Sequence, residues 1–158
     1  MPREIKMTAI TQISAYCECG ALALHINEKP VVQLVCHCSD CRAFSGLPYT
    51  ELVFFKPEGC SAHGQTDMTV MKGDTGFDKI HYSCLSCQTP LYVTIAALNG
   101  ATAVVAKRLS SFTFEPQAHI WTSKKLNSVT IPTGMIQSLG RPPKEIAKNM
   151  VSMFWGKK

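Results

Sequence analysis

The stretch CHCSDCRAFSG, residues 36–46, decides how this chain of 158 residues is interpreted. It brings three cysteines within six residues, so a single turn of backbone can direct three sulfur atoms at one ion. These three are Cys36, Cys38 and Cys41. Four more cysteines form two tight pairs: Cys17 with Cys19, and Cys84 with Cys87. Cysteines this close in sequence make poor disulfide partners but good chelators, so the pattern predicts metal binding.

The coordination chemistry of zinc divides these seven cysteines into a group of four and a group of three. Structural zinc takes four protein ligands in a tetrahedron, whereas catalytic zinc keeps three and leaves one position for water or substrate. The most economical division joins the two outer pairs and leaves the middle three together. The outer pairs are about half the chain apart, so a metal joining them would close a long loop and supply folding free energy. We therefore expect two zinc ions per chain, one structural and one with an open coordination position.

Three residues near these groups carry weaker signals. Cys60 is unpaired in a glycine-containing loop and is expected to be a small buried side chain rather than a ligand. His37 lies between two proposed ligands, so its side chain points away from the metal in an extended backbone and is expected to pack or hydrogen-bond. Arg42 is either a solvated surface residue or a bidentate partner for a ligand carboxylate. The remaining histidines lack ligand spacing: His25, His63, His81 and His119.

Composition and length exclude several classes of protein. With 46% hydrophobic and 17% charged residues, the chain is expected to fold as one globular domain over residues 1–158. The net charge of +5 is scattered, which argues against nucleic acid and is compatible with a small anionic ligand. No stretch approaches the roughly 20 apolar residues of a membrane span, and the first fifteen residues lack a signal-peptide pattern. The expected location is the cytoplasm, where reducing conditions favour thiols over disulfides.

The hydrophobic pattern predicts a mainly β fold with a short C-terminal helix. The expected strands are residues 13–17, 21–26, 31–36, 49–55, 68–72, 79–84, 91–95 and 101–105. Ile146, Met150 and Phe154 recur with a helical period behind two prolines, which predicts a helix over 143–154. A second short helix is expected over 133–139, ended by Gly140.

Four motifs carry a resemblance to a known family: YCECG (16–20), CHCSDCRAFSG (36–46), SCLSC (83–87) and AHIW (118–121) with Ser123-Lys124. Over about residues 14 to 125, the chain resembles the glutathione-dependent formaldehyde-activating enzymes, also called the Gfa-like or centromere-protein-V-like zinc domains. In that family an aromatic residue usually precedes the last cysteine pair and a glycine follows it. Here Ser83 and Gln88 occupy those places, and every cysteine of the motifs is retained.

The resemblance implies folded antiparallel β-sheets organised around zinc, followed here by a C-terminal extension. It implies a structural zinc on Cys17, Cys19, Cys84 and Cys87, and an active-site zinc on the catalytic group Cys36, Cys38 and Cys41. It also implies a carbon–sulfur lyase-type activity, the interconversion of glutathione and formaldehyde with S-hydroxymethylglutathione. The partner is then a small thiol such as glutathione, with Arg42 as the candidate substrate-binding residue.

Two alternatives to a zinc-dependent lyase stay open. In a non-enzymatic zinc module engaging a protein partner, a fourth protein ligand such as His37 would close the second site. In a redox sensor, reactive and exposed thiolates at the middle group would release zinc on oxidation.

Overall fold

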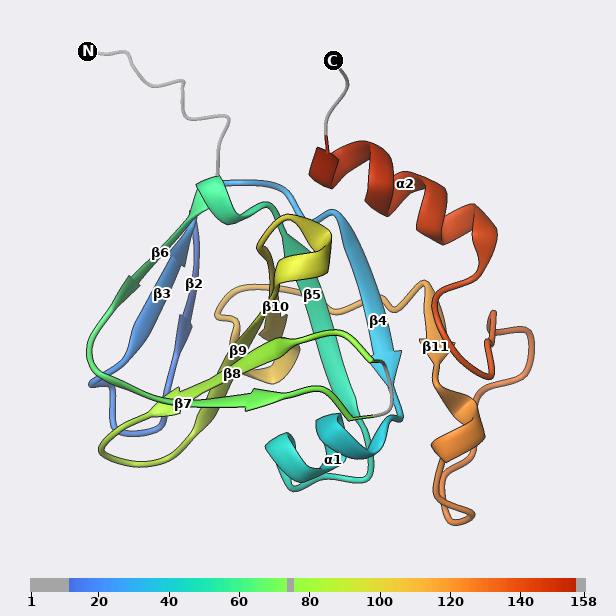
Figure 1. Ribbon diagram of the computed structural model, residues 1–158. Helices are drawn as coiled ribbons and strands as arrows, with labels where there is room; N and C mark the ends of the chain where they lie inside the picture. Colours follow the sequence, from blue (N-terminus) through green and yellow to red (C-terminus); the bar gives the residue numbers. More distant parts are fainter. Residues whose placement is uncertain (1–11, 74–75, 156–158) are drawn as a thin grey trace.

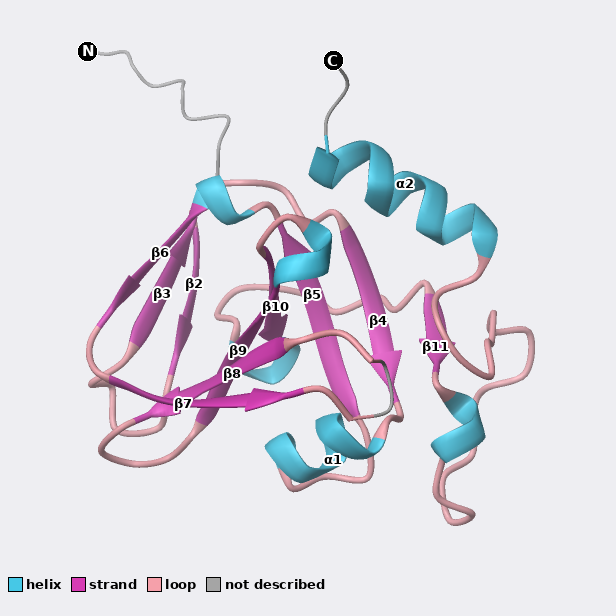
Figure 2. Ribbon diagram, in the orientation of Figure 1, coloured by secondary structure: helices cyan, strands magenta, loops and turns pink. Residues whose placement is uncertain are grey.

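The computed structural model describes residues 12–73 and 76–155, and within them ten strands form two sheets (Figures 1 and 2). The larger sheet has the order β11-β4-β5-β10-β9-β8-β7 and contains β4 (Val32–Cys36), β5 (Thr50–Phe55), β7 (Thr66–Met71), β8 (Lys79–Cys84), β9 (Pro90–Ile95), β10 (Ala101–Val105) and β11 (Ala118–Ile120). The smaller sheet has the order β2-β3-β6 and contains β2 (Ile13–Tyr16), β3 (Ala23–Ile26) and β6 (Cys60–His63). The helices are α1 (Ser39–Ser45) and α2 (Lys144–Trp155), with short 3-10 turns η1 (Pro57–Gly59), η2 (Ala96–Leu98), η3 (Ala106–Arg108) and η4 (Thr122–Lys124). The prediction of a mainly β chain with a short C-terminal helix is confirmed.

Alternation of side chains divides the larger sheet into two buried faces. Leu52 and Phe54 of β5 pack in one hydrophobic cluster, together with α2 and the middle cysteines. Val53 and Phe55 of the same strand pack in a second cluster, against the smaller sheet. Because successive side chains of a strand point to opposite faces, the central strands β5, β9 and β10 serve both clusters. Figure 1 accordingly shows the smaller sheet and α2 on opposite sides of the larger sheet.

Strand pairing is antiparallel throughout the two sheets except at one edge. There β11 runs parallel to β4, with Ile120 opposite Cys36. On its other side, Cys36 is paired with Thr50 of β5. The last residue of β4 is therefore held between two neighbouring strands, which fixes the position of the first cysteine of the middle group.

Each of the eight predicted strands overlaps an observed strand, and the predicted helix over 143–154 corresponds to α2. The structure adds three elements that the sequence pattern did not predict: β6, β11 and α1. The predicted helix over 133–139 is wrong. Its backbone bonds to β11 instead of to itself: the His119 N–H donates to the carbonyl of Ile136, and the Ser138 N–H donates to the carbonyl of His119, both at 2.9 Å.

The C-terminal helix α2 packs on the sheet face that holds the middle cysteines. Ile146, Met150 and Phe154 are its buried residues, at the spacing that places them on one side of a helix. Asn99 of the turn after η2 donates from its side-chain amide to the carbonyl of Phe154 at 2.8 Å, which anchors the helix end. Among the described residues, no helix has the length and apolar character needed to cross a bilayer.

Candidate metal centres

The four outer cysteines converge on one point. The sulfur atoms of this four-cysteine group all lie within 4.8 Å of one another; its members are Cys17, Cys19, Cys84 and Cys87. Zinc–sulfur bonds of about 2.3 Å in a tetrahedron place the sulfurs about 3.8 Å apart. The sulfur of Cys19 lies 3.7 Å from those of both Cys17 and Cys84. The four thiols therefore fit a tetrahedral zinc ion.

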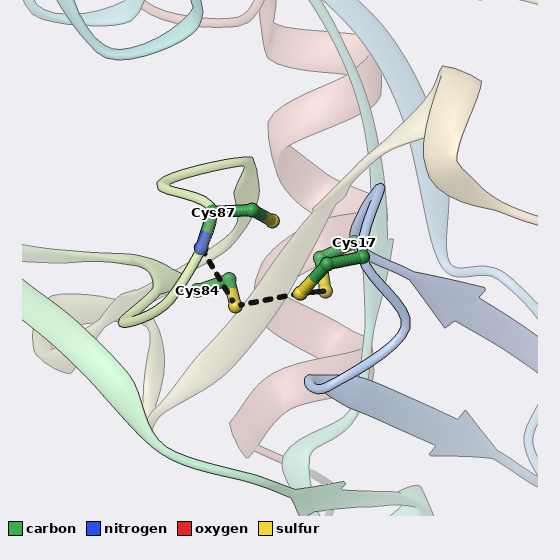
Figure 3. Close-up of side chains that lie close together, drawn as sticks. Cys17, Cys84 and Cys87 are labelled. Atoms are coloured by element: carbon green, nitrogen blue, oxygen red, sulfur yellow. Dashed lines mark hydrogen bonds between the residues drawn. The ribbon is translucent and has the colours of Figure 1, made fainter.

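Two turns build the four-cysteine group from opposite parts of the chain. Figure 3 shows Cys84 and Cys87 on one turn and Cys17 facing them from another. In each turn a backbone N–H donates to a sulfur: Leu22 to Cys17 at 3.2 Å, and Cys87 to Cys84 at 3.4 Å. Such bonds orient metal ligands and stabilise the thiolate form.

Hydrogen bonds also prepare these thiols for a metal, which binds the deprotonated form. A hydrogen bond with the Thr89 hydroxyl, 2.9 Å from the sulfur, lowers the pKa of Cys87 to about 5. Burial opposes ionisation of Cys17, but hydrogen bonds from the Leu22 N–H and from neighbouring thiols lower its pKa overall. A hydrogen bond with the Ala21 backbone lowers the pKa of Cys19, but hydrogen bonds with the neighbouring thiols, above all Cys87, outweigh it and raise this pKa to about 12. Cys17 and Cys87 are therefore shifted toward the thiolate form, whereas Cys19 is shifted toward the neutral thiol.

Gln88 stands directly after the last cysteine pair, where a glycine is usual in the family that the chain resembles. Its φ of 63° lies in the left-handed region, and its N–H donates to the carbonyl of Cys84 at 2.8 Å. Glycine adopts this conformation without steric cost, whereas other residues adopt it at a penalty. The turn therefore keeps the glycine-like geometry with a glutamine in place.

The three middle cysteines form a second group on the other face of the larger sheet. The sulfur atoms of this three-cysteine group, Cys36, Cys38 and Cys41, also lie within 4.8 Å of one another, and all three residues are buried. Cys36 ends β4, Cys38 caps the N-terminus of α1, and Cys41 lies in its first turn. The Cys41 N–H donates to the Cys38 sulfur at 3.3 Å, as in an N-cap. The short helix thus folds the stretch so that three sulfurs meet.

The three-cysteine group is arranged to carry negative charge. Hydrogen bonds from the thiols of Cys36 and Cys41 lower the pKa of Cys38 to about 2. Its bond to Cys38 in turn raises the pKa of Cys36 to about 12. Without metal, one thiolate is therefore held by its two protonated neighbours, and a divalent cation would displace those protons. A set of three soft thiolates suits zinc.

The three-cysteine group opens into a cavity of about 320 Å³. Its walls come from the sheet face of β4, β5, β8, β9 and β10, from Trp121, and from the C-terminal segment. Besides the three cysteines, three polar or charged residues line it: Lys79, His81 and Arg141. The cavity gives a small molecule access to the sulfur atoms, as an open coordination position requires.

The positive charge of Lys79 is balanced by a buried carboxylate. Its ammonium group donates to the Asp40 carboxylate at 2.8 Å, and both side chains are almost completely buried. Burial favours the neutral amine, but the bond to Asp40 outweighs it and raises the pKa of Lys79. Gly73 lies so close that a Cβ at this position would overlap the Asp40 carboxylate. The pair therefore ties β8 to α1 and fixes the helix that carries Cys38 and Cys41.

His81 is the polar group of the cavity whose hydrogen-bonding capacity is unused. Its side chain is 2% exposed, and neither ring nitrogen has a hydrogen-bond partner in the described part of the chain. The ring packs edge-on against Phe44 of α1 at 4.6 Å between centroids. Burial lowers the pKa of His81, so the neutral imidazole is favoured. A neutral imidazole offers one donor and one acceptor, and neither is used by another side chain of the described residues.

The residues singled out beside the cysteines take other positions. The His37 Nε2 lies 2.9 Å from the Nδ1 of His119, and His37 does not belong to the three-cysteine group. Arg42 donates to the carbonyls of His37 and Lys124, at 2.7 and 2.5 Å, and does not line the cavity. Arg141 lines it instead, with its guanidinium 5.0 Å from the centre of the Phe77 ring. The sequence carried no local signal for Arg141 at the cavity, because the position of this residue depends on how the C-terminal segment folds back onto the sheet.

Cys60 stays outside both cysteine groups. Its half-buried thiol donates to the carbonyl of Lys56 at 3.6 Å and packs against the second hydrophobic cluster. Burial raises its pKa to about 11, so the neutral thiol persists at neutral pH. We expected a buried side chain, and the structure places a half-buried one that packs against this cluster.

The geometry describes a mainly β protein with one four-cysteine group and one three-cysteine group, each able to hold a metal ion, and with a cavity beside the three-cysteine group. The model of the family described as glutathione-dependent formaldehyde-activating enzyme matches residues 12–124, and the chain belongs to this family. Membership indicates chemistry related to glutathione and formaldehyde. The match ends before the segment that carries Arg141 and α2.

Among solved structures, the fold is similar to the crystal structure of a Rhodobacter sphaeroides protein. The TM-score is 0.50 and the sequence identity 16%, over 63% of this chain and 90% of that one. At this identity the similarity concerns the fold. No curated protein matches the chain.

Proposed function

We propose that this chain is a zinc-dependent carbon–sulfur lyase-type enzyme, which acts on the adduct of glutathione or a related thiol with a small aldehyde such as formaldehyde. The observation that carries the proposal is the opening of the three-cysteine group into a cavity. The four-cysteine group holds the structural zinc, and Cys36, Cys38 and Cys41 hold the zinc of the active site. When bound there, zinc supplies a coordination position that favours the thiolate form of a substrate thiol.

The reaction exchanges a carbon–oxygen π bond for a carbon–sulfur bond and moves a proton from sulfur to oxygen, without oxidation or reduction. In adduct formation, the thiol loses its proton, its sulfur bonds to the carbonyl carbon as the carbon–oxygen π bond breaks, and the carbonyl oxygen gains a proton. In the reverse direction, the hydroxyl oxygen loses that proton, the carbonyl re-forms, and the electrons of the carbon–sulfur bond return to sulfur. His81 is the group that hydrogen-bonds this oxygen and exchanges its proton, because its ring nitrogens have no other partner in the described chain.

Two observations support an enzyme over the alternatives. His37 bonds to His119 rather than joining the three-cysteine group, which favours an open position over a closed zinc module. The three thiols are at most 6% exposed and lie in the wall of a cavity, whereas a redox sensor presents its reactive thiolates on the exposed surface.

Calorimetry on the zinc-loaded protein tests the proposal. Glutathione should bind at millimolar concentration or below, whereas S-methylglutathione should bind at least tenfold more weakly, because its methylated sulfur is a poorer zinc ligand. Exchange NMR on glutathione with formaldehyde should show faster interconversion with the adduct when the protein is present. Equal binding of the two ligands together with unchanged exchange rates would remove the proposal.

A matched pair of substitutions localises the effect. Cys38→Ser should abolish both thiol binding and accelerated exchange, because it removes one of three ligands. Cys60→Ser makes the same change outside both cysteine groups and should leave both intact. If the two variants behaved alike, the three-cysteine group would not be the reaction site.

A further inference from the structure

The cavity beside the three-cysteine group is apolar beyond its sulfur atoms. The larger sheet contributes Leu34, Phe54 and Val93, and the C-terminal helix contributes Met150 and Val151. Lys79 adds no free charge, because Asp40 neutralises it at 2.8 Å. A charged ligand placed against such walls would lose hydration without gaining partners. The walls therefore favour a ligand with an apolar body.

One wall of the cavity is built outside the part of the chain that matches the family. The match ends at residue 124, and the lining residues beyond it are Arg141, Pro142, Ala147, Met150 and Val151. Buried Ile146, Met150 and Phe154 fix α2 on the sheet, so this wall has a defined position. The shape and polarity of the cavity thus depend on a segment that the family match does not include.

Polar groups of the cavity are few, and each suits one part of a thiol adduct. The sulfur atoms of Cys36, Cys38 and Cys41 mark the place of the reacting sulfur. His81 offers unpartnered ring nitrogens for a hydroxyl or carbonyl oxygen. Arg141 is exposed and lies over the ring of Phe77, where it suits one anionic group. Glutathione carries two carboxylates and an ammonium group, more charge than this lining can match.

We propose that the C-terminal segment makes this cavity specific for thiol adducts in which an apolar group, such as an aromatic ring, is attached close to the carbon–sulfur bond. The inference rests on the proposed function, since it assumes that a thiol sulfur binds at the three-cysteine group. It adds that the preferred substrate is less charged than the formaldehyde adduct of glutathione and more apolar next to its carbon–sulfur bond.

Three probes test the specificity for apolar adducts separately from the proposed function, in calorimetric titrations of the zinc-loaded protein. We expect 2-phenylethanethiol to bind at least tenfold more tightly than 2-mercaptoethanol, because its ring is buried in the cavity. The alcohol 2-phenylethanol, which lacks sulfur, should bind more weakly than 2-phenylethanethiol. Equal affinities of the two thiols would overturn the specificity and leave the proposed function intact. If neither thiol bound, the proposed function itself would fail, and this inference with it.

Substitutions on α2 test the contribution of the C-terminal segment. Ala147→Asp places a carboxylate in the cavity wall. It should weaken the binding of 2-phenylethanethiol at least tenfold, with little effect on the binding of 2-mercaptoethanol. Asn149→Asp adds the same charge on an exposed position of the same helix and should change neither affinity. An unchanged affinity of folded Ala147→Asp for 2-phenylethanethiol would overturn the role of this wall. The comparison of probes on the unmodified protein decides the specificity even if Ala147→Asp does not fold.

Two reaction arms locate the apolar group on the substrate. One arm pairs 2-phenylethanethiol with formaldehyde, and the other pairs 2-mercaptoethanol with benzaldehyde. Exchange NMR should show at least one arm accelerated tenfold more than 2-mercaptoethanol with formaldehyde, and the faster arm identifies which component carries the ring. Equal acceleration of all three pairs would overturn the proposal.

Discussion

The sulfur atoms of Cys19 and Cys84 lie 3.7 Å apart, although 65 positions separate the two residues in the chain. An ion bound at this point would tie β2 and β3 of the smaller sheet to β8 of the larger one. The three-cysteine group, by contrast, comes from one continuous stretch. Loss of metal therefore has different consequences at the two groups, because only the first closes a long loop.

Removing a ligand from the four-cysteine group should destabilise the whole chain. The free energy of binding structural zinc, about 10–16 kcal/mol, is comparable to the whole stability of a typical domain. We expect Cys84→Ala to unfold the protein or to lower its melting temperature strongly, and Cys38→Ala to have a much smaller effect. Thermal melts in reducing buffer measure both. Equal losses would mean that the structural and active-site roles need to be exchanged or merged.

Zinc content and thiol counting test the division of the cysteines. Protein prepared under reducing conditions should contain two zinc ions per chain by elemental analysis. Of the eight cysteines, only Cys60 lies outside the two groups, and its raised pKa, about 11, should make it react slowly with thiol reagents. Chelator and denaturant should expose all eight, and Cys60→Ser should remove the slow reaction. A single zinc ion together with three more reactive thiols would contradict a metal site at the middle group.

The buried pair of Asp40 and Lys79 should be costly to break from one side. Asp40→Asn leaves a buried ammonium without its counter-charge and should reduce the free energy of unfolding by about 3–5 kcal/mol. The double variant Asp40→Asn with Lys79→Met removes both charges and should recover part of that loss. Urea denaturation of the zinc-loaded variants measures the two values. A double variant less stable than either single one would show that the pair is not coupled in this way.

The left-handed conformation of Gln88 predicts a stabilising substitution. Gln88→Gly relieves the steric cost of a φ of 63° and should raise the free energy of unfolding by about 0.5–1 kcal/mol, after the entropy that glycine adds to the unfolded chain. Chemical denaturation measures the gain. Ser86→Gly, on the same turn, has no such strain to relieve and should not stabilise. A loss of stability in Gln88→Gly would contradict the strain argument.

Sequence spacing was sufficient to predict the three-cysteine group and each of the two outer pairs, because local turns bring together ligands within a few residues of one another. The joining of the outer pairs, which lie far apart in the chain, followed instead from the division into four and three ligands that zinc chemistry favours. The strand pattern also held wherever one strand face was buried and apolar residues alternated. It failed at β11, whose three residues are too few to show a period. It failed again at β6, an outer strand of the smaller sheet in which most side chains are exposed.

The rest of the candidate site depends on contacts between distant segments. His81 reaches the cavity because β8 pairs with β7 and β9, and Arg141 because α2 packs on the sheet. Neither position has a local signature. Arg42 follows the last cysteine of the group directly, yet two backbone carbonyls bind its guanidinium, and adjacency in sequence did not bring it into the cavity. Its predicted role in substrate binding stays a prediction.

His81 provides the sharpest separation of function from stability. A buried imidazole without hydrogen-bond partners destabilises a folded chain by about 1–3 kcal/mol, so a purely structural role would not favour histidine here. We expect His81→Leu to keep two zinc ions, to raise the melting temperature, and to slow adduct exchange about 100-fold or more. His63→Leu makes the same change on an exposed residue of β6 and should alter none of these. Thermal melts, elemental analysis and exchange NMR on the two variants give the three readouts. If His81→Leu lost stability while exchange stayed fast, His81 would be a packing residue, and the proton on the substrate oxygen would have to move through another group.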